Sequence, residues 1–436
     1  MSRTRLSGIV TLALAAVLLA GAPAGAQVLV QCPGDLNGDS VPDPYLLKNN
    51  GTPSNRPNPD YDPNVQCMHL SGGDGFSVMA DGKLQYIFSF ADLTGIGDEN
   101  DNGDISDDIM SAGALAAAWP APVIVGDQGS RYYLNLTNVG MLIRPDLFDP
   151  HTVHFHGFPQ SSTVFDGLPE SGLSINMGAT LTYFYDLVEP GTYMYHCHVE
   201  ATEHMQMGML GNLYVRPAQN RLPDGTMLSA YIHNNPDYNA VPGLDDPLVG
   251  DKYAYNDGDG STLYDVEYPL QLGSFDPEFH DASYTVQPLP FAMMWDRYPM
   301  INGRGYPDTV NPNALPAPPE SGVESQVESS LITASKGQKI LLRLSNLNIT
   351  TVHTLSSPSI PMKVVGVDAK ELRNAAGPLH YDTNSVTMGG GMSYDVILDT
   401  ADVAAGTYYL YAANLNHLSN YNEDFGGMMT EIVIAP

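Results

Sequence analysis

Metal-ligating side chains crowd into residues 151–209, and this cluster constrains the fold more than any other feature. The stretch holds six of the twelve histidines and one of the three cysteines. Its candidate ligands are His151, His154, His156, His196, Cys197, His198, His204 and Met209. Thiolate, imidazole and thioether groups together favour copper among the transition metals. The fold must therefore bring the two ends of this stretch together.

The spacing of these residues predicts two sites that share one strand. Side chains alternate between the faces of a β-strand, so His154 and His156 share a face if their segment is extended. His196 and His198 also share a face, and Cys197 points the opposite way. We expect one site of imidazoles and a second site around the thiolate, joined by the few covalent bonds around Cys197.

The thiolate side has the composition of a blue-copper site, which takes one thiolate, two imidazoles and a weak thioether. The matching residues are His151, Cys197, His204 and Met209. His151 precedes His154 by three residues and so has the parity of a Cys197 partner. Met205 and Met207 are alternative axial ligands that the sequence leaves open.

Short strands separated by turns predict an all-β fold. Gly (42), Pro (34) and Tyr (25) are abundant, and long helical patterns are scarce. The strand-like segments lie at 84–90, 122–125, 132–136, 181–185, 191–195, 213–215, 339–344, 362–367, 394–398 and 407–411. Both series have a Gly-Thr-Tyr strand late in the domain, at 191–193 and 406–408. The repeated order predicts two related β-sandwich domains.

The chain divides into five predicted parts. Arg3 and Arg5 precede an apolar stretch at 9–20 and a small-residue site at 24–26, as in a signal peptide. The parts are a signal peptide (1–26), a loop-rich extension (27–75), a first sandwich with the copper ligands (76–218), a linker or insertion (219–263) and a second sandwich without copper motifs (264–436). No later stretch is apolar enough to span a membrane. We expect export to the periplasm or the exterior.

Export makes the cysteine count informative. In an oxidising compartment, Cys32 and Cys67 can pair and staple the N-terminal extension. Cys197 is then the odd cysteine, and its flanking histidines give it a role as a metal ligand.

Two acidic loops resemble calcium-binding loops, because they space oxygen ligands at alternate positions around a glycine. Their candidate ligands are Asp35, Asn37, Asp39 and Asp43 in the first loop, and Asp98, Asn100, Asn102 and Asp104 in the second. The second loop ends at Ile109, where an EF-hand loop has a bidentate glutamate. The alternative is that both loops are solvated acidic turns.

The net charge of −31 argues against nucleic acid and anionic lipid as partners. It is compatible with a cationic substrate such as a metal ion. It also keeps an exported chain soluble without any partner.

The motifs resemble those of multicopper oxidases over most of residues 75–436. The resembling segments are His151-Thr152-Val153-His154-Phe155-His156-Gly157, Tyr195-His196-Cys197-His198-Val199-Glu200, Val164-Phe165-Asp166-Gly167, Gly208-Met209-Leu210-Gly211 and Ile301-Asn302-Gly303-Arg304. The resemblance implies two cupredoxin-like Greek-key β-sandwich domains. It also implies bound copper, a small reductant (a phenol or a metal ion) and dioxygen as the second substrate.

The resemblance also implies roles for individual residues. His151, Cys197, His204 and Met209 match the type 1 copper ligands. His154 matches a type 2 ligand, and the type 3 matches are His156, His196 and His198. Asp166 matches an acid that passes protons to reduced oxygen, and Glu200 is a second candidate for that role.

The chain departs from the family where the oxygen-reducing cluster needs its second half. That cluster draws on four HxH-type pairs, and only two pairs are present. The second sandwich has isolated histidines only, namely His280, His353, His380 and His417. Identical chains in a dimer or trimer could complete a site at their interface. His353 of the partner subunit could instead complete a mononuclear site, as in copper nitrite reductases, or it is an ordinary sandwich histidine.

The sequence thus predicts an exported multicopper oxidase-like oxidoreductase that passes electrons from a reductant, through a type 1 copper, to a second copper centre that reduces dioxygen. One alternative is a copper nitrite reductase-like enzyme. Another is a blue-copper electron carrier or copper-binding protein without catalytic activity.

Overall fold

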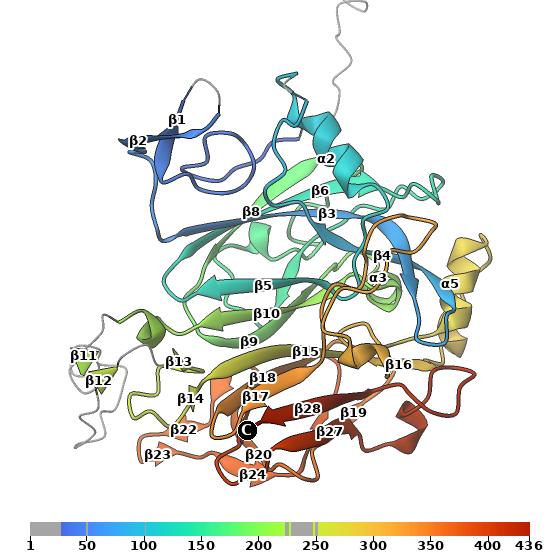
Figure 1. The fold of residues 1–436 in the computed structure, drawn as a ribbon. Helices are drawn as coiled ribbons and strands as arrows, with labels where there is room; N and C mark the ends of the chain where they lie inside the picture. The colour runs from blue at the N-terminus through green and yellow to red at the C-terminus, as the bar shows by residue number, and fades with distance from the viewer. Residues whose placement is uncertain (1–27, 49–50, 101, 223–225, 228–246, 249–251) are drawn as a thin grey trace, which may run out of the picture.

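The computed structural model describes residues 28–48, 51–100, 102–222, 226–227, 247–248 and 252–436 (Figure 1). The predicted signal peptide and most of the expected linker lie outside the described residues. The described residues form two β-sandwiches, and the predicted all-β class is confirmed.

The first sandwich consists of two four-stranded sheets. One sheet has the order β4(Leu84–Asp92), β3(Val65–Val78), β6(Arg131–Gly140) and β8(Thr180–Asp186). The other has the order β5(Ala121–Asp127), β10(Leu210–Arg216), β9(Gly191–His196) and β7(His154–His156). β3 runs parallel to β6, and β5 runs parallel to β10, whereas the other neighbours are antiparallel.

The second sandwich repeats this arrangement. One sheet contains β16(Tyr298–Ile301), β15(Val266–Phe275), β18(Lys339–Asn346), β26(Met392–Asp399), β20(Met362–Val367), β21(Lys370–Glu371) and β24(Tyr381–Thr383). The other contains β17(Ile332–Ser335), β28(Met429–Ala435), β27(Gly406–Ala412), β19(His353–Ser356) and β25(Ser385–Met388). β15 runs parallel to β18, and β17 runs parallel to β28.

The remaining elements are short. The helices are α2(Ile105–Gly113), α3(Ala201–Met207) and α5(Pro277–Tyr284). The 3-10 turns are η1(Thr163–Phe165), η2(Ala218–Arg221), η3(Phe291–Met293), η4(Asp308–Val310) and η5(Leu415–His417). Two-stranded pairings involve β1(Tyr45–Leu47), β2(Pro53–Pro57), β11(Thr226–Met227), β12(Pro247–Leu248), β13(Lys252–Tyr253), β14(Leu263–Tyr264), β22(Arg373–Asn374) and β23(Gly377–Pro378). No helix among the described residues is long and apolar enough to cross a membrane.

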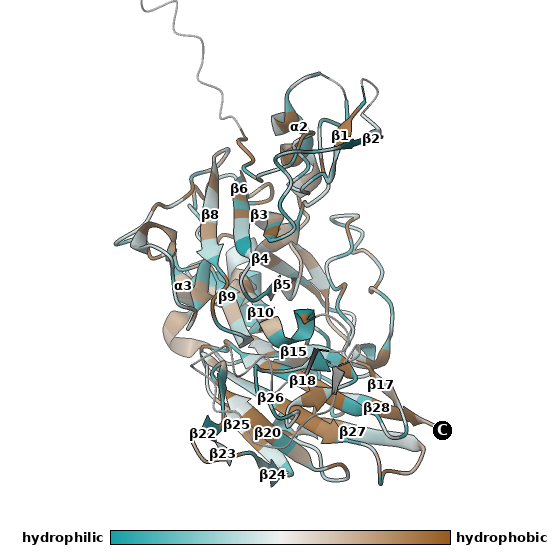
Figure 2. Ribbon diagram, turned by 90° about the vertical axis from the view of Figure 1, so that its left-hand side faces the viewer, coloured by the Kyte–Doolittle hydropathy of each residue, from teal (hydrophilic) through white to brown (hydrophobic). Residues whose placement is uncertain are grey.

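Each sandwich has its own apolar core. The first core includes Phe155 stacked on Tyr185, with ring centroids 3.8 Å apart, and it also contains Cys197 and Met209. Figure 2 shows apolar segments along β20, β26 and β27, where the second core lies. Burying one large apolar side chain stabilises a fold by about 1.5–3 kcal/mol, so these cores hold the two sandwiches rigid around any site between their sheets.

The two sandwiches contact each other through β9 of the first and β18 and β26 of the second (Figure 1). The guanidinium of Arg343 is fully buried there and lies 2.8 Å from Glu267 and 3.4 Å from Asp395. The hydroxyl of Thr192 on β9 donates to Asp395 over 2.6 Å. Because a buried charge needs such partners, this polar cluster fixes how the sandwiches meet.

The N-terminal extension is tied to the first sandwich by a disulfide between Cys32 and Cys67, the pairing that the sequence favoured. Cys67 lies on β3, which begins at Val65 and crosses the expected domain boundary at residue 76. The run Gly72-Gly73-Asp74-Gly75 hides this strand in the sequence, because three of its four residues lack a side chain that could show the alternation of faces.

Candidate metal centre

Three elements position the candidate ligands. His151 forms an isolated bridge with Ile175 and precedes β7, which carries His154 and His156. β9 pairs with β7 and ends at His196, so that Cys197 and His198 follow at the same end of the sheet. The chain then turns into α3, which carries His204.

On the thiolate side, His151, Cys197 and His204 converge inside the first sandwich. Their ligand atoms lie within 4.8 Å of one another, and all three residues are fully buried. Nδ1 of His204 is 3.2 Å from Sγ of Cys197, and the ring centroids of His151 and His204 are 5.2 Å apart. The backbone N–H of Thr152 points at the same sulfur over 3.5 Å.

Three of the four imidazole nitrogens on this side lack a hydrogen bond, although Nε2 of His204 lies 3.7 Å from the carboxylate of Asp149. Neither ring nitrogen of His151 has a hydrogen-bond partner, and Nε2 of His204 has none either. An unsatisfied buried polar group costs about 1–3 kcal/mol, so such atoms normally serve another purpose. Two imidazoles that converge on a thiolate fit copper.

The charges on this side favour the thiolate form of the cysteine. Burial lowers the pKa of His204, but the larger opposing effect of Cys197 and Asp149 raises it to about 10. Burial raises the pKa of Cys197, but His204 more than offsets this and the net shift is downward. The thiolate is the form that binds metals, and His204 would give up its proton when a metal ion binds.

The axial position has three candidate methionines, which lie in different places. The carbonyl of Met209 accepts a hydrogen bond from the backbone N–H of Cys197 over 3.1 Å, so Met209 adjoins the thiolate. Met207 belongs to the same core, whereas Met205 lines the cavity on the opposite face. The geometry therefore favours Met209 over Met205.

On the opposite face, four histidines line an open cavity of about 460 Å³. The four are His154, His156, His196 and His198. The ring of His154 lies 5.2 Å from that of His196 and 5.3 Å from that of His198. Ligand atoms of His154, His156 and His196 lie within 4.8 Å of one another. The alternation of faces therefore separates the two sites as the spacing predicts.

Backbone carbonyls orient two of these imidazoles. Nδ1 of His154 donates to the carbonyl of Asp166 over 2.6 Å, and Nδ1 of His196 donates to that of Cys197 over 2.7 Å. Each hydrogen bond leaves Nε2 as the ring nitrogen for a metal, and Nε2 of His196 lies 3.4 Å from Nδ1 of His156. Burial lowers the pKa of His154 and of His156, and it lowers that of His196 to about 3. Burial thus favours the neutral form of these three rings, which is the form that binds a metal.

The second sandwich closes one wall of this cavity without contributing a histidine. Its lining residues there are Leu347, Asn348, Ile349, Gly390 and Gly391. A Cβ at Gly391 would lie 2.8 Å from Nε2 of His156, so the backbone approaches the imidazole closely. This wall gave no signal in the sequence, because none of its residues is a typical ligand.

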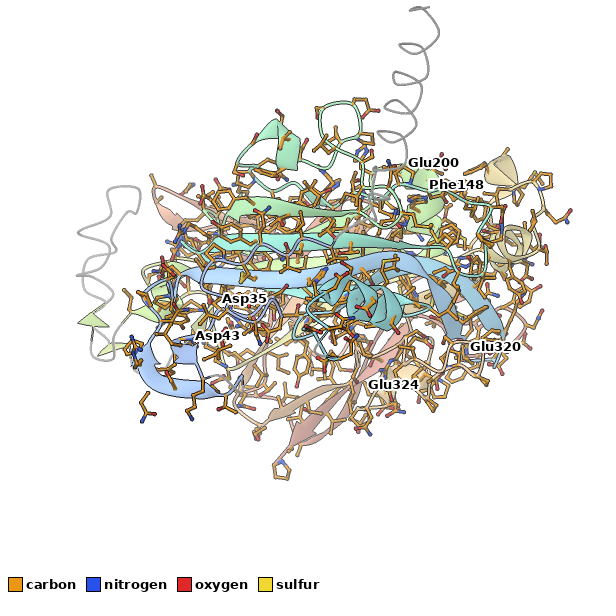
Figure 3. The ribbon with its side chains drawn as sticks, turned by 90° about the horizontal axis from the view of Figure 1, so that it is seen from above. Asp35, Asp43, Phe148, Glu200, Glu320 and Glu324 are labelled. Carbon is orange, nitrogen blue, oxygen red and sulfur yellow. A yellow bond between two sulfur atoms is a disulfide. The ribbon has the colours of Figure 1, made fainter. Side chains whose placement is uncertain are left out.

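The two predicted acids lie on different sides. The carboxylate of Asp166 lies 3.4 Å from Nδ1 of His154, on the cavity side. Glu200 instead lies on the thiolate side, where its carboxylate groups with Asp149 and His204 within 4.8 Å. It occupies the turn into α3 and is exposed (labelled in Figure 3). The turn carries Glu200 towards His204, whereas the expected role of Glu200 is at the oxygen-reducing cluster.

The segments that carry these ligands match a known family. Two family models described as multicopper oxidase match the chain, over residues 107–220 and 287–432. The chain belongs to the multicopper oxidase family. The first match covers both histidine motifs, whereas the second covers a region without HxH pairs.

Individual multicopper oxidases resemble parts of the chain. A multicopper oxidase of Talaromyces pinophilus is 33% identical over 115 residues, which are 26% of this chain and 17% of that protein. A laccase of Phlebia radiata is 23% identical over 316 residues, or 71% of this chain and 48% of that protein. The chain therefore spans less than half the length of these relatives.

Solved structures support the cupredoxin-type fold. The blue copper oxidase from Nitrosomonas europaea matches with a TM-score of 0.57 and 22% identity. The match covers 85% of this chain and 86% of that one. This likeness confirms the fold of two cupredoxin-like domains.

The histidines of the second sandwich do not reach the cavity in the same chain. His280 is buried between two carbonyls, those of Tyr86 (2.6 Å) and Gln206 (3.0 Å). His353 faces His417 at a separate place, with Nδ1 atoms 3.3 Å apart. Sequence reasoning missed this pair because the two residues are 64 positions apart.

The geometry does not support the calcium prediction in the described residues. Asp35 uses its carboxylate to accept the backbone N–H groups of Asn37, Gly38 and Ser40. Asp104 caps α2 by accepting from Ser106, and Ile109 is a fully buried core residue of that helix. Neither loop brings three carboxylates together within 4.8 Å in the part of the chain that is described.

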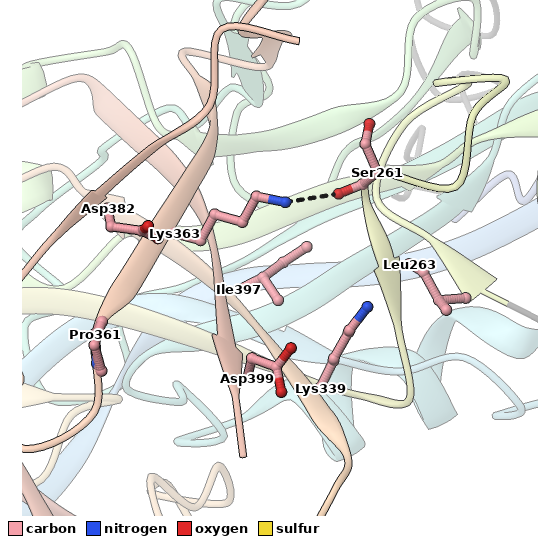
Figure 4. Close-up of a pocket in the computed structure, with 8 residues that line it drawn as sticks. All are labelled: Ser261, Leu263, Lys339, Pro361, Lys363, Asp382, Ile397 and Asp399. Carbon is pink, nitrogen blue, oxygen red and sulfur yellow. Dashed lines mark hydrogen bonds between the residues drawn. The ribbon is translucent and has the colours of Figure 1, made fainter. Parts of the chain in front are cut away.

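A further cavity of about 380 Å³ lies in the second sandwich (Figure 4). Its walls carry Lys339, Lys363, Asp382 and Asp399, and Lys363 donates to the carbonyl of Ser261 over 3.2 Å. None of the described residues that line it is a histidine, cysteine or methionine, so these residues do not suit copper.

Proposed function

We propose that the protein is an exported copper oxidoreductase that oxidises a small reductant and reduces dioxygen. One observation carries the proposal. Cys197 is buried with His151 and His204, while its two neighbours in the chain, His196 and His198, line the cavity on the other face. The peptide bonds from Cys197 to His196 and to His198 thus connect an electron-accepting site to a second metal site.

Each face has a proposed ligand set. The type 1 set comprises His151, Cys197, His204 and Met209, and the second set comprises His154, His156, His196 and His198. Copper bound in these sets supplies one-electron redox chemistry. The protein's part is to hold the thiolate in an anhydrous core and to connect it covalently to His196 and His198.

Reduction of dioxygen to water consumes four protons along with four electrons, so the cavity needs a proton supply. Asp166 suits this role, because its carboxylate contacts His154 at the cavity and remains partly exposed. The same residue orients His154 through its carbonyl. We assign Asp166 the delivery of protons from solvent to the cavity.

The reductant meets the molecule near His204. Asp149 and Glu200 form a negative rim there, and the exposed ring of Phe148 is close by in sequence. The rim favours a cation such as Fe(II), Mn(II) or Cu(I), and the ring suits a phenol. Each reductant molecule gives one electron to the type 1 site, and a phenol also releases its proton to solvent.

The cavity points to a homo-oligomer, either a dimer or a trimer. The described residues supply four histidines to an open cavity, whereas the resemblance implies eight. A second copy facing the cavity would double the number of ligands. The disulfide between Cys32 and Cys67 supports export to the periplasm or the exterior, because such bonds persist in oxidising compartments.

Replacing Cys197 with serine tests the proposal. Copper-loaded wild-type protein should show a blue absorption band and consume oxygen with a phenol or a metal ion. Cys197→Ser should lose the band and nearly all oxygen uptake, because the thiolate that gives the colour is gone. A blue band that survives in the variant, or a blue wild-type protein without turnover on any of these reductants, contradicts the proposal.

A further inference from the structure

The second sandwich contains two histidines that face each other, and one of them, His417, also has its Nε2 3.3 Å from the side-chain amide nitrogen of Asn414. Nδ1 of His353 lies 3.3 Å from Nδ1 of His417, and the rings are 4.9 Å apart. His353 is fully buried, and its Nε2 has no hydrogen-bond partner. The pair resembles His151 and His204, whose rings are 5.2 Å apart.

The strand register places the two pairs at equivalent positions. In the first sandwich His154 pairs with His196, and in the second Ser356 pairs with Tyr411. His151 precedes His154 by three residues, and His353 precedes Ser356 by three. Each histidine also pairs with an antiparallel neighbour, His151 with Ile175 and His353 with Met388. His353 therefore corresponds to His151.

Backbone hydrogen bonds extend the correspondence to the other ligands. Cys197 donates to the carbonyl of Met209 (3.1 Å), and Ala412 donates to that of Met428 (2.9 Å). Met209 donates to the carbonyl of His204 (2.8 Å), and Met428 donates to that of His417 (2.9 Å). The second sandwich thus repeats every ligand position of the thiolate site, with Ala412 in place of the cysteine.

We propose that His353, His417 and Met428 form a second, colourless copper site that binds Cu(I). Two imidazole nitrogens, each about 2.0–2.1 Å from a tetrahedral metal ion, lie about 3.3 Å apart, which matches the Nδ1 separation. Met428 is fully buried, as Met209 is. Imidazole and thioether ligands without a thiolate favour the cuprous ion, and no blue band arises without the cysteine.

Restoring the missing thiolate tests the geometry directly. The parent protein is Cys197→Ser, which removes the colour of the first site. Adding Ala412→Cys to this parent should restore a blue absorption band when copper is supplied, because the new thiolate joins two imidazoles and a thioether. If this double variant has the circular dichroism spectrum of its parent and stays colourless with copper, the proposed ligand geometry is wrong.

Counting bound Cu(I) tests the site in the otherwise natural chain. Full-length protein is titrated with Cu(I) without oxygen, against a chromophoric Cu(I) chelator. His353→Ala should bind one Cu(I) fewer per chain than wild type, and His417→Ala should do the same. The matched control is His380→Ala, a second-sandwich histidine that lies 3.5 Å from Glu371.

The Cu(I) count separates this proposal from the proposed function. Equal Cu(I) counts in His353→Ala and wild type show an ordinary histidine pair and overturn the second site. A loss of Cu(I) equally large in His380→Ala also overturns it, because the effect is then not specific to the pair. The two tests measure the blue absorption band and the number of bound Cu(I) ions, so their results hold whether or not the first sandwich reduces oxygen.

Discussion

At the residue scale, the exposed carboxylate of Glu200 is the most direct handle on the choice of reductant. It lies with Asp149 beside His204, where electrons enter in our account. A negative charge near the surface attracts a cation by about 0.5–1 kcal/mol. Glu200→Gln should therefore raise KM for Fe(II) about two- to fivefold with little change in kcat. Steady-state oxygen uptake measures both constants.

Two controls accompany this prediction. A neutral phenol should show no change in KM in Glu200→Gln, because it carries no charge for the carboxylate to attract. Glu320→Gln removes an exposed acid that lies well away from Glu200 in Figure 3 and should leave both substrates unaffected. An unchanged KM for Fe(II) in Glu200→Gln would contradict the claim that this negative rim attracts a cationic reductant.

His69 gives the fold a dependence on pH that is separate from copper. It is fully buried on β3, where Nε2 lies 2.8 Å from the hydroxyl of Thr137. Burial lowers the pKa of His69 to about 4, from about 6.5 in an unfolded chain. The folded state therefore binds fewer protons, and its stability is full above pH 6.5 and falls as the pH drops towards 4.

The variant His69→Gln should flatten this dependence. The shift corresponds to about 2–3 kcal/mol of unfolding free energy lost between pH 7 and pH 4.5. Urea unfolding of copper-free protein at the two pH values measures this loss in wild type and variant. If both proteins lose the same free energy, His69 is not titrating as its burial requires.

The sequence could predict the candidate ligands because their chemistry is rare and their spacing alternates. The separation of Cys197 from His196 and His198 follows from the geometry of any strand. The position of Glu200 could not be predicted, because it depends on a left-handed backbone turn at that residue (φ 44°). The pair of His353 and His417 emerges only when the strand register is known.

At the scale of elements, the turn between β25 and β26 supports the histidine cavity. Gly391 has a φ of +89°, and a Cβ there would lie 2.8 Å from Nε2 of His156. Gly391→Ala should displace this imidazole and lower oxygen uptake by tenfold or more. The blue band should remain, because the thiolate lies on the other face. Absorption and oxygen uptake of one copper-loaded sample test both statements.

Gly337→Ala is the matched control for backbone strain. Gly337 has a φ of +96°, and an added Cβ there would meet nothing within 4 Å. Both variants incur the left-handed strain of about 1–2 kcal/mol, but only Gly391→Ala touches a histidine. Equal losses of oxygen uptake in the two variants would show that strain alone, and not His156, explains the effect.

The elements themselves could be predicted where apolar alternation is clear, as on β6 and β18. β3 was only partly visible because its glycines carry no side chain, and its start at Val65 needs the pairing with β6 and β4. In the calcium-like loops, by contrast, the sequence pattern is clear but the geometry does not support the prediction. Their spacing resembles a ligand pattern, but the carboxylates of Asp35 and Asp104 accept hydrogen bonds from their own backbone.

At the scale of the whole molecule, the two sandwiches are equivalent in topology and unequal in chemistry. The first combines a thiolate site with four cavity histidines, whereas the second offers only an imidazole pair and a wall for the cavity. In our proposal, the oxygen-reducing centre therefore needs a second copy of the chain. The sequence could predict this shortage, because the histidines can be counted, but the proposed assembly involves surfaces outside one chain.

The central claim is that Cys197 joins a blue-copper site to a second copper site. Copper counting with electron paramagnetic resonance on the purified oligomer tests it most directly. The account predicts a type 1 signal with a blue band, together with additional copper of a different spectroscopic class. Protein that is saturated with copper but shows one class of copper and no blue band would contradict it.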